Sequence, residues 1–146
     1  MRHHCRLVTA AVVLTAFASP SFAQAQEPIQ NAPAWELAWE TTPEGVAFAA
    51  LVGDRFAEPY MAMVRLPAGL ISPAHVKTAN MFGVVVSGTM THVIEGADPS
   101  KGQPLPPGSF YRIAAGVAHI SSCVSDSECV VFLYQDGKFD FLPTAQ

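Results

Sequence analysis

The sequence is poor in charge. Only 14% of its 146 residues are Asp, Glu, Lys or Arg, and 8 basic residues against 12 acidic ones leave a formal net charge of −4. It contains no run of basic residues. Because phosphate contacts supply most of the affinity of a protein for nucleic acid, the sequence excludes DNA and RNA as partners. Half of the residues are apolar, which is typical of a chain that folds around a core and not of a disordered one.

Long apolar runs are lacking, apart from one near the N-terminus. Residues 7–18 are almost all apolar, but a membrane-spanning helix needs about 20 such residues. Arg2 and Arg6 precede this run, and small residues follow it. These are the three regions of a secretory signal peptide. The sequence therefore predicts a signal peptide over residues 1–25, a single mature domain over 26–146 without membrane insertion, and a periplasmic or secreted location.

Cysteine is scarce too. Of three cysteines, only Cys123 and Cys129 belong to the predicted mature chain. An even pair in an exported protein favours a disulfide, here across two adjacent strands that flank a short polar loop. A metal-binding pair and a redox site are the alternatives. A redox motif would have the tighter Cys-x-x-Cys spacing.

Helical periodicity is absent. Short apolar or alternating segments are instead separated by Gly- and Pro-containing turns, which is the pattern of β-strands. We expect strands over residues 35–40, 45–51, 60–66, 82–86, 89–94, 110–113, 117–123, 129–135 and 138–142. Ser87 and Gly88 lie between two of these segments and indicate a β-hairpin. Nine or more short strands predict an all-β sandwich or barrel.

Two groups of residues in this pattern have a distinctive spacing. The first group is Gly69, His75, Lys77, Met81 and Gly88, and the second is Gly108, Ala114, Gly116, His119 and Cys123. The spacings resemble the two motifs of the cupin superfamily. That resemblance implies a single-domain double-stranded β-helix, also called a jelly-roll barrel, and a homodimer. It supports a fold more strongly than a function, because this superfamily carries many chemistries on one barrel.

The departures from the cupin pattern concern the metal site. The resemblance implies a site of three His and one Glu, of which His75 and His119 occupy two places. Lys77 stands where another His would be, and Met81 stands where the Glu would be. The standard cupin metal site is therefore incomplete, and we expect weak or absent binding of iron, manganese or nickel. Copper binding through His75, His119 and Met81 remains an alternative, because thioether sulfur is a soft ligand.

The spacing of His75 and Lys77 places both side chains on one face of a strand, because they are two residues apart. The cupin resemblance implies that this face is the barrel interior and that His119 faces it from a neighbouring strand. We predict a ligand-binding site made of His75, Lys77, Met81 and His119. Burial lowers the pKa of a lysine, so Lys77 is a candidate catalytic base or an anion-binding group. The alternative is that Lys77 extends to solvent at the barrel mouth.

One further histidine and the two tryptophans are predicted to lie outside the site. His92 lies on the strand after Gly88, and we expect it at the surface or rim of the barrel and not in the site. Trp35 and Trp39 are expected to be core or interface aromatics.

The sequence leads to three functional hypotheses. The first is an exported cupin whose pocket binds a small acidic or oxygen-rich molecule, as an enzyme or not, with or without assistance from a metal on His75 and His119. The second is a non-catalytic ligand-binding or sensor domain without metal. The third keeps a divalent metal or copper on the two histidines, with non-protein ligands completing its shell.

Overall fold

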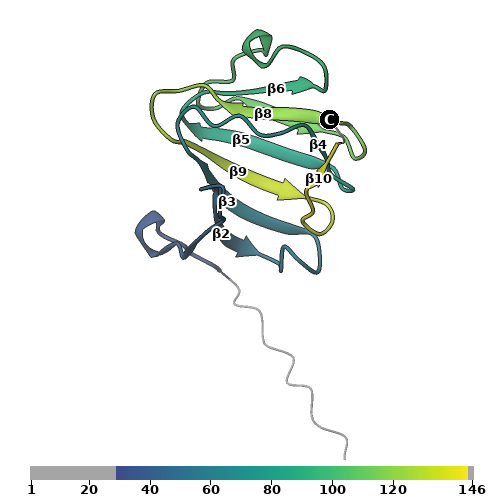
Figure 1. The fold of residues 1–146 in the computed structure, drawn as a ribbon. Helices are drawn as coiled ribbons and strands as arrows, with labels where there is room; N and C mark the ends of the chain where they lie inside the picture. Colours follow the sequence, from purple (N-terminus) through teal and green to yellow (C-terminus); the bar gives the residue numbers. More distant parts are fainter. Residues whose placement is uncertain (1–28, 145–146) are drawn as a thin grey trace, which may run out of the picture. The chain divides into compact units, whose positions relative to one another are not determined.

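A computed structural model describes residues 29–144, which are nearly all β-structure (Figure 1). In this part of the chain ten strands form two sheets, and the helical elements are two single turns of 3-10 helix, η1 (Ala34–Glu36) and η2 (Pro99–Lys101). The strands belong to one unit that begins at Ala32. The all-β fold is confirmed. The predicted signal peptide lies outside the described residues and stays a prediction.

The two sheets differ in size. The larger sheet has six strands in the order β1 (Trp39–Thr41), β2 (Ala47–Val52), β3 (Tyr60–Leu66), β9 (Cys129–Gln135), β5 (Met81–Ser87) and β7 (Phe110–Ile113). The smaller has four strands in the order β10 (Leu142–Pro143), β4 (His75–Val76), β8 (His119–Cys123) and β6 (Met90–Ile94). All pairings are antiparallel. Figure 1 shows β5, β9, β3 and β2 lying side by side in this order.

Alternating side chains place the hydrophobic core between the sheets. In β3 every second residue from Tyr60 to Leu66 is buried, and β9 repeats the pattern from Cys129 to Gln135. Alternate residues of a strand point to one face, so one side of each strand faces the core. The expected bounds of β3, β7 and β9 are confirmed, because a period of two identifies such half-buried strands.

The segment at Ser87 and Gly88 does not close the expected β-hairpin. β5 pairs with β7 and β9, whereas β6 pairs with β8 in the other sheet, so this turn carries the chain between sheets. Gly88 has a φ of 74°, and a Cβ there would lie 2.7 Å from Cys129 Sγ. A turn is present at Gly88 as predicted, but a turn does not determine which strands hydrogen-bond to one another.

The expected strand over residues 35–40 is also wrong in its first half. Pro33 accepts a hydrogen bond from the Glu36 N–H at 2.9 Å, which closes the single turn of η1. Trp35 is 85% exposed and is not part of the core. β1 begins only at Trp39, whose ring centroid lies 3.8 Å from the guanidinium carbon of Arg65. This contact of a cation with an aromatic face covers Trp39 at the end of the larger sheet.

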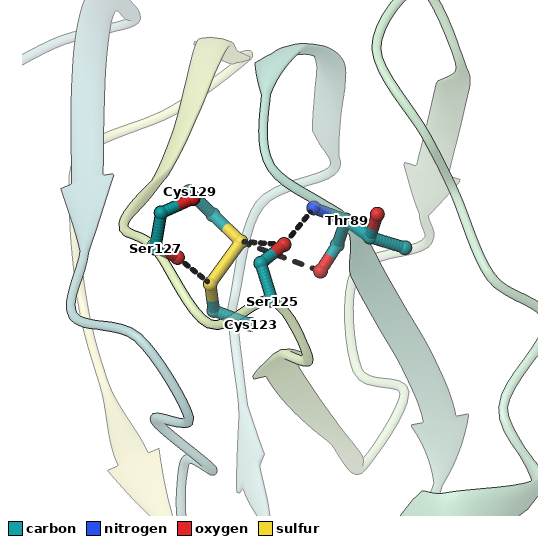
Figure 2. Close-up of a disulfide and its surroundings, with 5 residues drawn as sticks. All are labelled: Thr89, Cys123, Ser125, Ser127 and Cys129. Atoms are coloured by element: carbon teal, nitrogen blue, oxygen red, sulfur yellow. Dashed lines mark hydrogen bonds between the residues drawn. A yellow bond between two sulfur atoms is a disulfide. The ribbon is translucent and has the colours of Figure 1, made fainter.

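The predicted disulfide is present between Cys123 and Cys129 (Figure 2). Cys123 ends β8 and Cys129 begins β9, so the bond joins the two sheets and not two adjacent strands as expected. Both residues are almost completely buried. Ser125, in the loop between them, accepts a hydrogen bond from the N–H of Thr89, the residue before β6. The bridge therefore fixes one end of the barrel.

Removing this bridge should destabilise the barrel. In the chain-entropy model, a loop closed by residues six apart contributes about 2 kcal/mol, so we expect Cys123→Ala with Cys129→Ala to lower the free energy of unfolding by that amount. Urea denaturation measures the change, and wild type treated with a reductant is the matched control. Two titratable thiols in denatured, unreduced mature protein would contradict the bridge.

Candidate functional site

A cavity of about 800 Å³ lies between the inner faces of the two sheets. Its two walls differ in chemistry. The larger sheet contributes mainly apolar side chains, namely Phe48, Val64, Leu66, Met81, Val131 and Leu133. The smaller sheet and the residue that follows β4 contribute polar ones, namely His75, Lys77, His92 and Ser121. A molecule in this cavity therefore meets hydrogen-bonding groups on one side and hydrocarbon on the other.

His75 and His119 are direct cross-strand partners on β4 and β8. Their ring centroids are 4.2 Å apart, and both residues are buried. His75 Nδ1 lies 2.9 Å from the Pro73 carbonyl oxygen, and His119 Nδ1 lies 2.9 Å from that of Val117. A carbonyl oxygen only accepts, so each Nδ1 carries the proton and donates it. The Nε2 atom of each ring is therefore left as an acceptor.

His92 is half-buried and lines the same cavity, so the expectation that it lies outside the site is wrong. On β6 it lies two residues from Ile94, the cross-strand partner of His119, which puts both histidines on the same face of the smaller sheet. Its ring centroid lies 4.2 Å from that of Tyr111, and its Nδ1 lies 2.9 Å from Ser121 Oγ. The sequence does not indicate that His92 points inward. The turn before it leads into the other sheet, and the local pattern does not show this change of sheet.

Burial keeps the three histidines neutral near pH 7. Loss of solvation lowers the pKa of His75 and of His92 to about 4, and it also lowers the pKa of His119. Neighbouring rings add to the effect, because a charge on one imidazole disfavours a charge on the next. The polar wall therefore offers neutral imidazole nitrogen.

Lys77 is only 5% exposed, so it does not extend to solvent. Its ammonium donates a hydrogen bond to the carbonyl oxygen of Asp140 and lies 3.9 Å from the ring centroid of Phe139. Burial lowers its pKa to about 8, and the negative charge of Asp140 opposes that shift. Such a pKa leaves Lys77 able to act as an anion-binding ammonium or, once deprotonated, as a base.

Residues 138–141 cover these groups and do not form the expected strand. Only Leu142 and Pro143 pair with β4. The Asp140 carboxylate accepts hydrogen bonds from the Thr78 N–H and, at 2.6 Å, from the Thr78 hydroxyl. The Phe141 ring stacks on His75 with centroids 4.0 Å apart. We call residues 138–141 the covering segment. Its alternating aromatics suggested a strand, but their partners are the side chains of the site.

Met81 is buried on β5 and lines the cavity from the larger sheet. Within residues 29–144, no group of three or more His, Cys, Asp or Glu side chains could hold a metal ion. The two histidines of the cupin pattern are close, but the other two places hold an ammonium and a thioether. An ammonium repels a divalent cation, so these residues do not fit the hard metals of the standard site.

Solved structures resemble the barrel at low sequence identity. The polyketide cyclase RemF from Streptomyces resistomycificus has a TM-score of 0.63 at 14% identity, with 81% of this chain and 87% of that chain covered. An oxalate oxidase has a TM-score of 0.61 at 17% identity, with 92% and 73% covered. An RmlC-like cupin from Shewanella frigidimarina has a TM-score of 0.57 at 14% identity, with 72% and 88% covered. These likenesses establish the fold alone.

The architecture and the structural neighbours define the class of fold: the chain has the double-stranded β-helix of the cupin structures that it resembles. Residues 22–145 match the family described as domain of unknown function 4437, and the chain belongs to that family. A search of curated protein sequences found no match. In the described part of the chain, no helix is long and apolar enough to cross a membrane.

The buried histidines should make the protein sensitive to acid. A histidine whose pKa is lowered from 6.5 to about 4 binds its proton more readily in the unfolded chain, so stability falls as the pH is lowered through that range. We expect His75 and His92 each to cost on the order of 1 kcal/mol or more by pH 4. Urea denaturation from pH 7 to pH 4 measures this loss. His92→Gln should reduce the slope, and an unfolding free energy that is constant over this range would contradict the burial.

Proposed function

We propose that the barrel binds a small, mainly apolar molecule with an anionic group, which Lys77 holds beside His75. The observation that carries this proposal is the buried ammonium of Lys77, which faces a cavity. In the described residues both ion pairs involve arginine, so no carboxylate pairs directly with this ammonium. A buried charge is costly without a partner, and an anionic ligand would supply one.

The Lys77 ammonium has more N–H donors than its partners in the protein use. Of its three N–H groups, one is used by the Asp140 carbonyl oxygen. The Phe139 ring lies against the ammonium without accepting a conventional hydrogen bond. Two donors are therefore left for a ligand oxygen. Carboxylates accept from ammonium groups in this way, and such charge-assisted bonds are stronger than neutral ones.

The size and lining of the cavity specify the rest of the ligand. A volume of about 800 Å³ falls in the range of sites for small organic molecules. The wall contributed by the larger sheet is mainly hydrocarbon, and aromatic rings lie at Phe48, Phe56, Phe139 and Phe141. These side chains suit an apolar, flat ligand body. The proposed ligand is therefore a carboxylic acid with an apolar body.

An enzyme and a non-catalytic sensor domain would both bind such a molecule. Only in an enzyme would Lys77 also transfer a proton. A pKa of about 8 leaves part of the Lys77 population deprotonated near neutral pH, which suits a base. Turnover of a bound acid that is lost in Lys77→Arg, with binding retained, would favour the enzyme. The donor set does not fit a hard metal, so the proposed function involves none.

Replacing Lys77 should remove the preference for an anion. We expect wild type to bind 2-naphthoate at least about tenfold more tightly than the uncharged 2-naphthamide, a difference of about 1.4 kcal/mol. Lys77→Met should bind the two probes alike, because the side chain keeps its volume and loses its charge. Isothermal titration calorimetry measures both affinities, and Lys101→Met, at an exposed lysine, is the matched control.

Two further measurements bear on the same prediction. Raising the pH above about 8 should weaken 2-naphthoate binding to wild type, because unliganded Lys77 then loses its proton. Metal analysis of protein purified without a metal column should find no tightly held iron or manganese. Stoichiometric iron or manganese that is lost in His75→Ala would contradict our interpretation of Lys77, as would unchanged 2-naphthoate binding in Lys77→Met. Copper is to be measured in the same samples, because Met81 lies in the cavity wall.

We also propose that two copies pair through the outer face of the larger sheet. A cross-strand row of apolar side chains crosses it, namely Met63, Phe132, Val84 and Phe110. Phe110 is 62% exposed, and the row contains no charge to oppose the same row of a second copy. We further propose a periplasmic or secreted location, which the predicted signal peptide and the disulfide support.

A charge placed in this row should separate the copies. We expect wild type to have the molar mass of a dimer, and Val84→Glu to have that of a monomer, because symmetry would bring two carboxylates together. Light scattering coupled to size exclusion measures the mass. Ile71→Glu, at an exposed residue away from the larger sheet, is the control. A wild-type monomer at tens of micromolar would contradict the pairing.

A further inference from the structure

The cavity that Lys77 faces is also lined by a second cation, Arg55. Arg55 lies in the loop between β2 and β3, and its side chain is only 17% exposed. Its guanidinium carbon lies 4.8 Å from the ring centroid of Phe48 and 4.5 Å from that of Phe56. Both rings line the cavity too. The proposed function uses Lys77 and leaves this second positive charge without a role.

The strand register puts the Arg55 guanidinium on the inner face of the larger sheet. Arg55 forms an ion pair with Glu40, in which Nη1 of Arg55 and Oε2 of Glu40 are 3.1 Å apart. Glu40 is the direct cross-strand partner of Phe48, and directly paired residues of an antiparallel sheet point to the same face. Phe48 is buried in the core between the sheets. The guanidinium that contacts both residues therefore lies on the cavity side of the sheet.

One aromatic cluster connects Arg55 to Lys77. Phe139 of the covering segment packs edge-on against Phe48 and Phe56, with ring centroids 5.4 Å and 6.2 Å apart. The Lys77 ammonium lies 3.9 Å from the centroid of the Phe139 ring. The Phe139 N–H also donates a hydrogen bond to the carbonyl oxygen of Arg55, which joins the covering segment to the loop between β2 and β3. The two cations therefore contact the same group of rings at one end of the barrel.

Arg55 has more hydrogen-bond donors than the protein uses. A guanidinium has five N–H groups, and within residues 29–144 the polar contact of this side chain is its ion pair with Glu40. Glu40 is 73% exposed, and an ion pair with so exposed a partner contributes only about 0–1 kcal/mol. A ligand carboxylate can therefore add to this pair or replace it. The planar fork of a guanidinium matches the two oxygens of a carboxylate.

Two acidic side chains close to Arg55 in the sequence or in the cavity leave its charge available. Glu44 lines the cavity but is exposed, so water and salt screen its charge. Asp54 is exposed as well, and its carboxylate accepts a hydrogen bond from the Phe56 N–H at 2.9 Å. Within the described residues, neither forms an ion pair with Arg55.

We propose that Arg55 holds a second carboxylate of the ligand whose first carboxylate lies at Lys77. This inference rests on the proposed function, because both groups belong to one molecule. Two cations that share an aromatic cluster define the ligand class as aromatic dicarboxylates, with the two carboxylates on different parts of the apolar body. Arg55 is then a specificity-determining residue, and it lies outside both cupin-like motifs of the sequence.

The test compares probes with one and with two carboxylates. Isothermal titration calorimetry is run with 2-naphthoate, with naphthalenedicarboxylates that carry the second carboxylate on the distant ring, and with the matching carbamoyl-2-naphthoates, in which a neutral amide replaces that carboxylate. In wild type we expect at least one dicarboxylate to bind about tenfold or more tightly than its carbamoyl counterpart. Arg55→Met should reduce this ratio to about twofold or less and keep the affinity for 2-naphthoate.

Three further variants make the test specific. Arg112→Met, at an exposed arginine of β7, is the matched control and should keep the ratio of wild type. Glu40→Gln releases the guanidinium from its ion pair, so the ratio should stay the same or rise. Arg55→Lys keeps the charge but loses the planar fork, so the ratio should fall between those of wild type and Arg55→Met. Circular dichroism and urea denaturation check that each variant is folded.

The outcomes separate this inference from the proposed function. If 2-naphthoate binds in a Lys77-dependent way but no dicarboxylate exceeds its carbamoyl counterpart, or if the ratio is unchanged in Arg55→Met, the inference is wrong and the proposed function stands. Loss of 2-naphthoate binding in folded Arg55→Met would also overturn it, because Arg55 would then support the cavity as a whole. If no carboxylate probe binds to wild type, the proposed function fails and the inference fails with it. Should Arg55→Met not fold, Arg55→Lys decides: a reduced ratio supports the inference, and an unchanged one overturns it.

Discussion

One side of the cavity is arranged around a buried charge, the ammonium of Lys77. The covering segment provides its contacts, through the carbonyl oxygen of Asp140 and the ring of Phe139. The same segment is tied down by the hydrogen bonds from Thr78 to Asp140, and it stacks Phe141 on His75. A charge inside a barrel is tolerated only when such groups surround it, so the position of residues 138–141 and the chemistry of the cavity depend on each other.

The two sheets contribute different side chains to the cavity, so its two walls differ in polarity. The larger sheet faces the cavity with hydrocarbon and so supplies most of the core, whereas the smaller sheet carries the three histidines and Ser121. Antiparallel pairing brings His75 directly opposite His119 and places His92 diagonally across from it. Burial then makes all three rings neutral acceptors, in contrast to the ammonium beside them. The polar groups of the smaller sheet therefore differ in charge and in hydrogen-bonding character.

Relative to the cupin metal site, this member of the family keeps the scaffold and changes the chemistry. Lys77 and Met81 occupy places at which a metal site needs an imidazole and a carboxylate. Relative to that pattern, the two residues remove a negative charge and add a positive one, which is the basis of the anion site that we propose. Hydrogen bonds to backbone carbonyl oxygens fix the tautomers of His75 and His119, so that Nε2 of each ring is an acceptor.

Features that depend on neighbours in the chain could be predicted from the sequence. A period of two identified the half-buried strands β3, β7 and β9 and put His75 and Lys77 on one face, and the cysteine spacing indicated the disulfide. Tertiary structure decided the features that depend on distant segments. His92 lines the cavity because the chain crosses to the smaller sheet at Gly88, so that β6 pairs with β8. Residues 138–141 cover the site because Asp140 accepts a hydrogen bond from the buried ammonium of Lys77. Local periodicity indicates which side of a strand is apolar. Which residues pack against that side is determined only when the barrel closes.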